Sequence, residues 1–476
     1  MGTQNFDAVV VGAGPGGYVC AIRLAQLGKK TAIIEKEYFG GVCLNVGCIP
    51  SKALIYASSE FYKIKNEYAH MGVIADSPRV DFKKMIEWKR GVVKQLTSGV
   101  SGLLKANGVT SIKGTAVFKA AGELEVTGES GKETITAKDI VIATGSRVLQ
   151  IPSLMFNGKN IITSTEALDL EKLPKKLIVI GGGFIGVEIG TVYAKLGSQV
   201  TIVEAMDKIL PTTDQELVKV VEKKLKKLGV TVLTSTKAQG LKEKDAVKAE
   251  LLHLDVEASG KTQTLEADVI LVSVGRRPNS DGIGLDKVGV KIDERGNVPT
   301  NQQGKTNVPG VWAIGDVTGA PQLAHRASMD GLLIAAAIAG EKSFKDYRCV
   351  PWAIFSDPEI ATVGLTEAEA TLKGIKFSVG RFPFAASGKA LASAEPEGFI
   401  KVIINEADET LVGVHMVGHD VSNLIAEAAL AIEMGATAED VIRTIHTHPT
   451  LPEALPEAIE QAFSKAIHIY KPNVRR

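Results

Sequence analysis

"VVVGAGPGGYVCAIRLAQLGKKTAIIE", residues 9–35, and "IVIGGGFIGVEIGTVYAKLGSQVTIVE", residues 178–204, are two copies of one pattern. In each copy a run of β-branched residues leads into G-x-G-x-x-G, and a helical segment then ends in Leu-Gly before a second apolar run. A terminal glutamate, Glu35 or Glu204, closes each copy. Because the internal spacing is identical, the repeat predicts two strand–turn–helix–strand units, each suited to bind a dinucleotide.

The glycines of the two turns have distinct expected roles. They are Gly12, Gly14 and Gly17 in the first copy and Gly181, Gly183 and Gly186 in the second. The first of each set allows the tight turn, the second lets the backbone approach a pyrophosphate, and the third lets helix and strand pack closely. The helix N-terminus then offers N–H groups and a partial positive charge to the phosphates, and the terminal glutamate accepts hydrogen bonds from a ribose diol. We therefore expect two bound dinucleotides per chain.

The second copy also predicts which nicotinamide cofactor it takes. A 2′-phosphate at Glu204 would face a carboxylate, and the next residues, "AMDK" (205–208), include no arginine to bind it. We therefore expect NAD rather than NADP at the second unit.

Three further segments have the pattern of strands that end in glycine turns. "DIVIATGSRV" (139–148) and "DVILVSVGRRPN" (268–279) each run from an aspartate through an apolar strand to a turn, at Gly145 and Gly275, and should complete the two nucleotide units. "VPGVWAIGDVTG" (308–319) leads to Gly315-Asp316. Considered alone, Asp316 is typical of the cap of a strand-to-helix turn.

Composition and charge exclude several classes of protein. A chain of 476 residues predicts two to four domains. A net charge of +1 gives no general field toward nucleic acid or an anionic membrane, and four cysteines make no disulfide framework of the secreted type. The longest apolar run, "GLLIAAAIAG" (331–340), is too short to cross a bilayer. We expect a cytoplasmic, enzyme-sized protein that binds neither nucleic acid nor membrane and has no metal site.

The stretch "GGVCLNVGCIPSKAL" (40–54) holds Cys43 and Cys48, for which a structural disulfide, metal ligation and redox chemistry are the alternatives. A loop this short removes little entropy from the unfolded chain, and no further cysteine lies near enough in the sequence to indicate a zinc site. Five residues of helix rise about 7.5 Å, beyond disulfide reach, so a bridged pair requires an irregular segment. A helix starting near Pro50 would place Cys48 at its positive end, which favours a thiolate and hence a redox pair.

The stretch "TIHTHPTLPEAL" (444–455) is a second candidate site. His446 and His448 are compatible with a metal-binding H-x-H, with polar residues before a helix, or with an imidazole that accepts a thiol proton while Glu453 orients the ring. The residues by themselves leave these alternatives open.

Five motifs in this order resemble the FAD-dependent pyridine nucleotide–disulfide oxidoreductases: "GGVCLNVGCIPSKAL", "GGGFIGVEIG", "GRRPN", "WAIGDV" and "HTHPTLPEA". The likeness spans essentially the whole chain, and C-x-x-x-x-C-I-P-S-K is its most specific element. It implies an α/β fold with two Rossmann-like dinucleotide-binding domains and a C-terminal α+β interface or dimerisation domain.

The expected domain boundaries follow from this likeness. They are 1–150 for the FAD-binding domain, 151–275 for the NAD-binding domain, 276–349 for a central segment that completes the flavin side, and 350–476 for the interface domain. In the last portion "GFIKVIIN" and "LVGVHMVG" predict strands, and "IAEAALAIEMG" and "PEAIEQAF" predict helices.

The resemblance also implies which residues bind the cofactors. Glu35 and the first glycine turn would hold the ADP half of FAD, and Asp316 would bind its ribitol. Glu204 and the second glycine turn would bind NAD. Lys52 would lie by the flavin and pair with Glu188.

Catalytic roles are implied in the same way. Cys48 would be the flavin-side sulfur and Cys43 the sulfur that exchanges with substrate. His448 would be the acid–base, oriented by Glu453, with His446 a non-catalytic neighbour. Because this histidine–glutamate pair serves the other subunit in the family, a homodimer is implied.

The likeness is greatest to members that oxidise protein-bound dihydrolipoamide to lipoamide and reduce NAD. Their partners are lipoyl domains of 2-oxo acid dehydrogenase complexes or the glycine cleavage carrier protein. Glutathione reductases share the cysteine element but usually bind NADPH with arginines after the second unit, and mercuric reductases add a C-terminal cysteine pair that "YKPNVRR" lacks. A non-catalytic, flavin-bearing docking subunit is the remaining alternative, although it would not need the cysteine and histidine–glutamate pairs.

Overall fold

The computed structural model describes residues 3–243 and 246–470, and the chain divides into two compact units. Unit 1 comprises the described residues up to Leu173 together with Val272–Asp346. Unit 2 comprises Pro174–Leu271 and the described residues from Tyr347 onward. The first two residues and "KPNVRR" (471–476), part of the stretch that lacks a cysteine pair, lie outside the described residues. The four-part division expected from the sequence stays a prediction.

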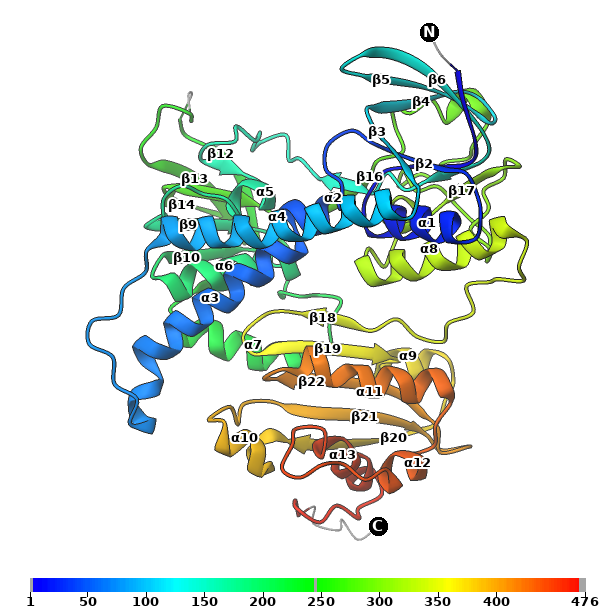
Figure 1. Ribbon diagram of the computed structural model, residues 1–476. Coiled ribbons are helices and arrows are strands. Elements are labelled where there is room, and N and C mark those ends of the chain that lie inside the picture. Colours follow the sequence, from blue (N-terminus) through cyan, green and yellow to red (C-terminus); the bar gives the residue numbers. More distant parts are fainter. Residues whose placement is uncertain (1–2, 244–245, 471–476) are drawn as a thin grey trace. The chain divides into compact units, whose positions relative to one another are not determined.

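Unit 1 alternates strands and helices in its first part and returns to the same sheet in its second (Figure 1). Its strands are β1 (Thr3–Val11), β2 (Thr31–Glu35), β3 (Thr110–Lys113), β4 (Thr115–Ala120), β5 (Glu123–Gly128), β6 (Gly131–Ile142), β7 (Ser146–Val148), β8 (Ile161–Ile162), β16 (Arg276–Pro278) and β17 (Val311–Ala313). Its helices are α1 (Pro15–Gln26), α2 (Gly41–Val46), α3 (Cys48–Asn66), α4 (Phe82–Ala106), α5 (Ser164–Ala167) and α8 (Ala324–Ala339), with 3-10 turns η1 (Tyr68–Met71), η2 (Asp286–Val288) and η3 (Gly315–Thr318).

The main sheet of unit 1 runs in the order β3-β2-β1-β6-β5-β4, and β17 also pairs with β6. β1 pairs in parallel with β2 and β6, as in a dinucleotide-binding fold, whereas β5 and β6 form an antiparallel hairpin. Residues 139–142 of the predicted closing strand lie in β6, and residues 311–313 form β17 beside it. Both strand predictions are confirmed.

Both faces of this sheet are buried, which explains the continuous apolar run in β1. Val9 and Val11 contribute to the core on one face, whereas Ala8 and Val10 contribute to a second core on the other. A parallel strand covered on both faces needs an apolar residue at every position. Cys20 of α1 is a fully buried packing residue of this second core.

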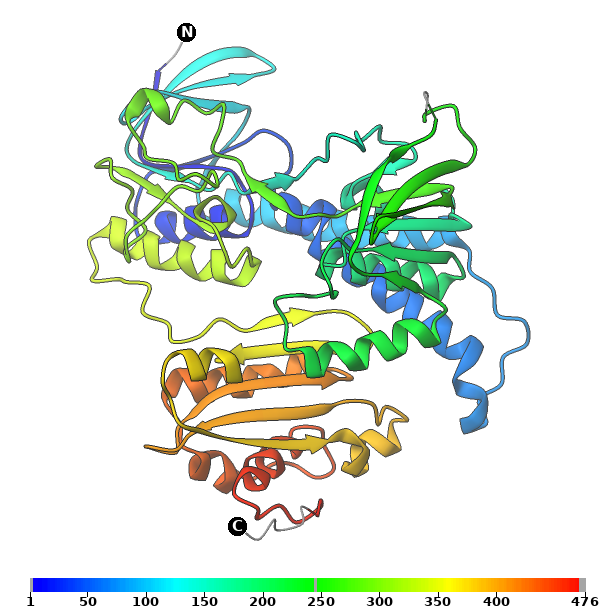
Figure 2. The same cartoon turned by 180° about the vertical axis from the view of Figure 1, so that it is seen from behind.

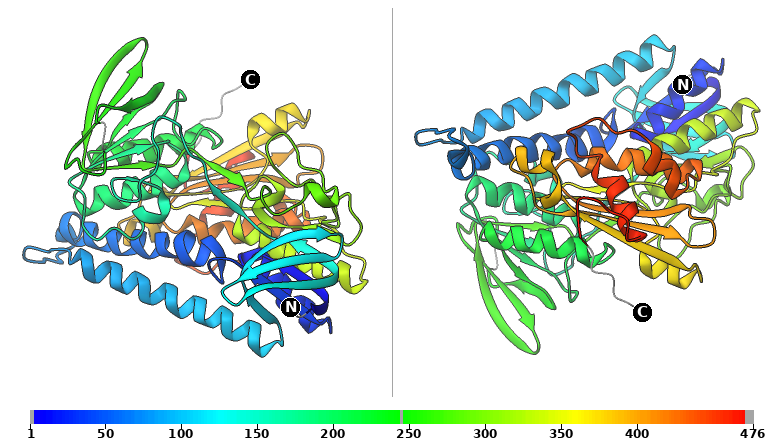
Figure 3. Two further views of the ribbon diagram at one scale, coloured as in Figure 1. Left: turned by 90° about the horizontal axis from the view of Figure 1, so that it is seen from above. Right: turned by 90° about the horizontal axis from the view of Figure 1, so that it is seen from below.

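The predicted apolar run 331–340 lies almost entirely in α8, which packs against α1. The two helices approach so closely that a Cβ at Gly331 would lie only 2.7 Å from the carbonyl oxygen of Gly16. Glycine at position 331 allows this approach. The two longest helices of this unit, α3 and α4, run side by side (Figure 3). The apolar run is therefore explained by burial inside unit 1.

Unit 2 contains the second glycine-rich copy and the C-terminal part of the chain. Its strands are β9 (Lys176–Ile180), β10 (Gln199–Val203), β11 (Thr231–Leu233), β12 (Thr236–Leu241), β13 (Leu252–Ala258), β14 (Lys261–Ala267), β15 (Val269–Val272), β18 (Trp352–Ile354), β19 (Glu359–Gly364), β20 (Phe377–Pro383), β21 (Phe399–Asn405) and β22 (Leu411–Gly418). Its helices are α6 (Phe184–Leu196), α7 (Gln215–Lys227), α9 (Glu367–Leu372), α10 (Gly388–Ala392), α11 (Val421–Met434), α12 (Ala438–Arg443) and α13 (Ala454–Ala462), with the 3-10 turn η4 (Phe384–Ala386).

The strands of unit 2 form three groups. β9, β10 and β11 are parallel and, with β15, follow the order β11-β10-β9-β15, while β12, β13 and β14 form an antiparallel sheet (Figure 2). The third group, here called the interface sheet, has the order β18-β19-β22-β21-β20. Helix α11 packs on β19 and β22, and α13 packs on β20 and β21. The strands and helices predicted for the C-terminal portion are confirmed.

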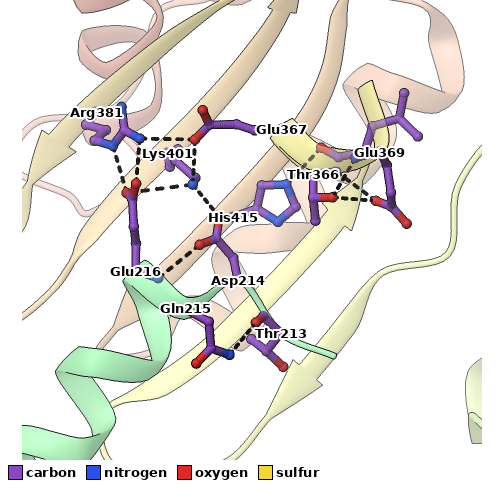
Figure 4. Close-up of polar contacts among 11 residues, drawn as sticks. Thr213, Asp214, Gln215, Glu216, Thr366, Glu367, Glu369, Arg381, Lys401 and His415 are labelled. Atoms are coloured by element: carbon purple, nitrogen blue, oxygen red, sulfur yellow. Dashed lines mark hydrogen bonds and ion pairs between the residues drawn. The ribbon is translucent and has the colours of Figure 1, made fainter. Parts of the chain in front are cut away.

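A buried charge cluster joins the start of α7 to the interface sheet within unit 2 (Figure 4). Lys401 of β21, whose side chain is 2% exposed, is ion-paired with Asp214 and with Glu367, the latter at 2.8 Å. Glu216 lies 3.6 Å from the Lys401 Nζ and accepts two hydrogen bonds of 2.9 Å from Arg381. Burial, the largest single influence, lowers the pKa of Lys401 and raises that of Asp214. The hydrogen bonds and opposite charges around each group together outweigh burial, so the Lys401 pKa is raised and the Asp214 pKa is lowered.

Replacing Lys401 by methionine should destabilise the protein by about 3 kcal/mol, because Asp214 and Glu367 lose their buried cation. Since the pKa of Asp214 is held below its ordinary value, the stability it contributes is present above that ordinary value and is lost as the pH falls through the folded-state value. The wild type should therefore lose stability below about pH 4 more steeply than the variant. Urea unfolding followed by circular dichroism at neutral and acidic pH measures both effects. Arg443→Met, which removes the exposed Arg443–Glu439 pair, should cost less than about 1 kcal/mol and is the control.

Candidate functional site

The first glycine turn is held by the carboxylate that closes its unit. Glu35 accepts a 2.7 Å hydrogen bond from the N–H of Ala13 through Oε2 and one of 2.7 Å from the N–H of Glu37 through Oε1. A Cβ at Gly17 would lie 1.9 Å from the carbonyl oxygen of Gly12. Helix α1 can therefore reach the turn this closely only through a glycine.

The second glycine turn repeats this hydrogen bonding. Glu204 accepts a 2.6 Å hydrogen bond from the N–H of Gly182 through Oε2 and one of 2.7 Å from the N–H of Met206 through Oε1. In both copies the carboxylate joins the turn before the helix to the backbone that follows the second strand. Each carboxylate is thereby oriented and keeps lone pairs that can accept from ribose hydroxyls, because it offers about four acceptor sites.

Both turns have room for a phosphate group. Gly14 and Gly183 are the N-cap residues of α1 and α6, and no described side chain caps either helix. A Cβ at either glycine would meet no described atom within 4 Å. No described side chain therefore covers the start of either helix at these positions, which fits the pyrophosphate of the dinucleotides expected at the two units.

The cysteine segment forms two helices, interrupted between the cysteines. Cys43 lies in α2, and Cys48 is the first residue of α3, two positions before the start predicted at Pro50. Gly47 separates the helices with φ −140° and ψ −109°, which are not helical angles. The irregular segment that a bridged pair requires is present, and Cys48 lies at a helix N-terminus as predicted.

This segment packs directly on the first glycine turn. The N–H of Gly40 donates to the carbonyl oxygen of Ala13 at 2.9 Å. A Cβ at Gly41 would lie 2.5 Å from the Cα of Gly14, so the two backbones are in direct contact. The structure therefore places the segment that carries the cysteine pair on the turn predicted to bind FAD.

Cys43 and Cys48 are unbridged thiols joined by a side-chain hydrogen bond. This hydrogen bond, burial and the negative charge that Cys48 can carry all raise the pKa of Cys43, while the Lys52 ammonium acts in the opposite direction. Burial and, to a smaller extent, the charge that Cys43 can carry also raise the pKa of Tyr18 on α1. Since Cys43 holds its proton firmly in this state, thiol exchange here needs a proton acceptor outside the pair.

Asp316 is held by Ser146, which Arg276 holds in turn, and sequence reasoning missed both residues. Ser146 Oγ donates to Asp316 Oδ2 at 2.6 Å, and Arg276 donates to the Ser146 Oγ at 2.7 Å and to its carbonyl oxygen at 2.6 Å. Burial lowers the pKa of Arg276, opposed by the negative charges of Asp316 and Cys48. Ser146 and Arg276 occur in the segments "GSRV" and "GRRPN", but nothing in their spacing indicated that Ser146 meets Asp316 or that Arg276 meets Ser146.

The two glycine turns at Gly145 and Gly275 lie together in unit 1, because β7 and β16 pair antiparallel. The N–H of Leu149 donates to the Gly275 carbonyl at 3.0 Å, and the N–H of Asn279 donates to the Gly145 carbonyl at 2.9 Å. The side-chain amide of Asn279 also donates to the carbonyl oxygen of Thr144 at 3.0 Å. The structure thus brings both predicted turns together, and their contact with a cofactor stays a prediction.

Lys52 lies in α3 of unit 1 and Glu188 in α6 of unit 2, so their expected pairing stays a prediction. The carboxylate of Glu188 is buried and accepts a 2.9 Å hydrogen bond from the N–H of Phe355. This contact ties α6 to the chain between β18 and β19 inside unit 2.

Two histidines differ in what their ring nitrogens face. His448 Nδ1 lies 2.9 Å from Glu453 Oε1, and the His448 side chain is 80% exposed. His446 Nδ1 lies 2.9 Å from the Thr444 carbonyl oxygen, while its Nε2 lies 2.7 Å from Glu427 Oε1. Because a carbonyl or carboxylate oxygen accepts, His448 donates from Nδ1 and keeps Nε2 for a proton, whereas both nitrogens of His446 are engaged. This geometry favours His448 as the acid–base.

Glu453 is fixed by donors on both of its oxygens. The N–H of Thr450 donates to Oε2 at 2.7 Å, and His448 donates to Oε1. Burial, the largest single influence, raises the pKa of Glu453, but these two hydrogen bonds together with the charges of His448 and His446 hold the pKa below its ordinary value. The anionic carboxylate therefore sets the tautomer of the His448 ring at neutral pH.

Among the described residues, no group of three or more His, Cys, Asp or Glu side chains is arranged to hold a metal ion. Each of three histidines near the C-terminal end instead faces one glutamate: His446 with Glu427, His448 with Glu453 and His468 with Glu457. No helix in the described part of the chain is long and apolar enough to cross a membrane.

Two family models match this chain, one over its N-terminal two thirds and one over its C-terminal part. A model described as pyridine nucleotide-disulphide oxidoreductase matches residues 6–331. A second, described as the dimerisation domain of the same family, matches residues 350–459. The predicted resemblance and the α/β fold class are confirmed, and the second match indicates pairing with a second copy of the chain.

Curated relatives extend this likeness over almost the whole chain. Dihydrolipoyl dehydrogenase of Geobacillus stearothermophilus is 48% identical, with 97% of each chain covered, and that of Bacillus subtilis is 47% identical, with 98% of each chain covered. Among solved structures, LpdA of Mycobacterium tuberculosis superimposes with a TM-score of 0.88 at 25% identity, covering 96% of this chain and 99% of that one. The HOCl-induced flavoprotein disulfide reductase RclA of Escherichia coli superimposes with a TM-score of 0.85 at 27% identity, again over 96% and 99%.

Gly14→Ala should give a folded protein that has lost its flavin. The added Cβ meets no described atom and suits the observed φ of −69°, but it occupies the space expected for the pyrophosphate. We expect the FAD bound per chain, measured by absorbance after gel filtration, to fall at least tenfold. Gly91→Ala, which also meets no described atom, should keep its flavin. Full flavin in the Gly14 variant would contradict this placement of the cofactor.

Proposed function

The chain belongs to the pyridine nucleotide-disulphide oxidoreductase family, and we propose that it oxidises protein-bound dihydrolipoamide to lipoamide while reducing NAD. The observation that carries the proposal is the hydrogen-bonded Cys43–Cys48 pair on a segment packed against the first dinucleotide turn. The curated relatives named dihydrolipoyl dehydrogenase support the same activity.

The two glycine turns supply the cofactor sites. The first turn with Glu35, together with Asp316, would hold FAD, and the second turn with Glu204 would hold NAD. When bound, the flavin supplies a two-electron relay between a dithiol and nicotinamide. The chain's own residues hold these groups, position the cysteine pair and handle the protons.

His448 takes the first proton in the proposed mechanism. With its Nδ1–H donating to Glu453, the ring presents the Nε2 lone pair to a substrate thiol. The thiolate formed attacks the Sγ of Cys43 in the bridged form of the pair. The Cys43–Cys48 bond then breaks, and Cys48 leaves with the electron pair as a thiolate.

The second substrate thiol completes the exchange. It attacks the substrate sulfur bound to Cys43, which closes the lipoamide disulfide and breaks the mixed disulfide. Cys43 departs with the second proton, as its raised pKa beside Cys48 favours. Two protons and two electrons have left the substrate, and they are held by the imidazolium of His448, the Cys43 thiol and the Cys48 thiolate.

The proposed assembly is a homodimer that serves lipoyl-bearing proteins. His448 and Glu453 lie in the part of the chain matched by the dimerisation domain, and the exposed His448 is available to the active site of a second copy. We propose lipoyl domains of 2-oxo acid dehydrogenase complexes, or the glycine cleavage carrier protein, as partners. A cytoplasmic setting is supported by the sparse cysteines, since a disulfide framework would need more.

Turnover with reduced lipoamide and NAD tests the proposal directly. NADH formation at a kcat within the usual range for enzymes, about 1–10³ s⁻¹, would support it. If the protein reduced glutathione disulfide or mercuric ion faster than it oxidised dihydrolipoamide, it would instead be a related reductase. A flavin-containing protein that is inert with all three substrates would be a docking subunit instead.

Cys48→Ser should retain FAD and lose lipoamide-dependent NADH formation, because a hydroxyl cannot form the disulfide. Activity is measured as the absorbance of the NADH formed from reduced lipoamide and NAD, and flavin content as the absorbance of the purified protein. Cys349→Ser is the matched control, because this thiol contacts the carbonyl of Ala429 and has no place in the mechanism. Near-normal turnover by the Cys48 variant would refute the redox role of the pair.

His448→Gln should lower kcat for dihydrolipoamide oxidation by about 10²–10⁴-fold, the usual contribution of a positioned general acid–base. His468→Gln is the control, because it removes an exposed histidine that also pairs with a glutamate. Steady-state kinetics with reduced lipoamide measures both variants. A loss of less than about threefold at His448 would mean that another group accepts the thiol proton.

A further inference from the structure

We propose that His446 and Glu427 form a clamp that positions the loop carrying His448, without either residue transferring a proton in the reaction. The loop comprises residues 444–453, between α12 and α13, and is called here the His448 loop. The inference deepens the proposed function and rests on it. His446 is thus a positioning residue, where the family resemblance gives it no role.

Hydrogen-bond counting shows why His446 is not itself the base. Its Nδ1 faces the carbonyl oxygen of Thr444, and its Nε2 faces a carboxylate oxygen of Glu427. Each of these contacts needs one proton, so the His446–Glu427 pair holds two protons and is neutral as a whole. Neither ring nitrogen has a lone pair left for a substrate proton.

The clamp is the hydrogen-bonded contact between the His448 loop and another element. Among the described residues, the other hydrogen bonds of segment 444–453 end within residues 440–455. The His446 side chain is 10% exposed, whereas the neighbouring Ile445 is 97% exposed and His448 is 80% exposed. His446 is therefore the inward-facing anchor of the first half of the loop, whereas Leu451 packs against the core in its second half.

Glu427 provides this anchor with a rigid base. It lies on α11, which buries Ile425 and Ala428 against the core of the interface sheet. The His446 ring thereby ties the loop to a packed helix two residues before His448. Because a shift of about 1 Å in a reacting group can cost 10²-fold in rate, loosening this anchor should reduce turnover while leaving the base itself in place.

The test compares Glu427→Ala, Glu427→Gln and His446→Ala with His468→Ala as the control. In Glu427→Gln the amide N–H can donate to His446 Nε2 while Nδ1–H still donates to the Thr444 carbonyl, so both hydrogen bonds survive with a neutral ring. We expect kcat with dihydrolipoamide to fall about 10–100-fold in both alanine variants and to return to within about threefold of wild type in the glutamine variant. The KM for NAD and the flavin content should not change.

Two further readouts separate positioning from catalysis and from the proposed activity. The pH profile of His446→Ala should keep the ionisation of the base seen in the wild type, because His448 is still present. Hydrogen exchange of the His448-loop amides, measured by mass spectrometry without substrate, should speed up about tenfold in Glu427→Ala and not in Glu427→Gln.

The outcomes distinguish the two proposals. Unchanged loop exchange in Glu427→Ala, or a glutamine variant as impaired as the alanine variant, would overturn the clamp. Loss of the pH-dependent ionisation in His446→Ala would make His446 the base and also overturn it. If loop exchange is faster in Glu427→Ala but the wild type does not oxidise dihydrolipoamide, the clamp is supported and the proposed function is wrong.

Discussion

The contact between the backbones of Gly14 and Gly41 is the constraint on which the site depends. A Cβ at position 41 would lie 2.5 Å from the Gly14 Cα, and the adjacent N–H of Gly40 donates to the Ala13 carbonyl. A side chain at Gly41 would force the segment with Cys43 and Cys48 off the nucleotide turn. One close approach thus brings a dithiol and a phosphate-binding turn together, which is what a relay from thiol to flavin needs.

A second regularity is the double use of one carboxylate in each copy of the repeat. Glu35 and Glu204 bind the backbone of their own glycine turns at 2.7 and 2.6 Å, so the group expected to receive the ribose also shapes the turn that receives the phosphates. The same negative charge disfavours a 2′-phosphate at Glu204. Fold and cofactor preference are therefore linked through a single side chain.

The histidine–glutamate pairs show how hydrogen-bond partners, more than residue type, assign chemical roles. His448 has one nitrogen facing Glu453 and the other open, whereas His446 has acceptors on both sides. The two histidines lie two positions apart, and their residue types and spacing by themselves do not distinguish their roles. The acceptors around each ring, one of them on the distant helix α11, are the structural basis for proposing His448 as the proton acceptor and His446 as an anchor.

The amino-acid sequence was enough to predict the two nucleotide units, because each is a local pattern in which strand, turn, helix and closing glutamate follow one another. It also determined the chemistry available at Cys43 and Cys48, since residue type and helix position set thiol reactivity. Which distant polar groups meet depends on the tertiary structure: Ser146 meets Asp316, His446 meets Glu427, and Lys401, inside a predicted strand, meets Asp214. A hydrogen bond or buried ion pair acts over about 3 Å, so its partner is chosen by the packing of whole elements and leaves no periodic trace along the chain.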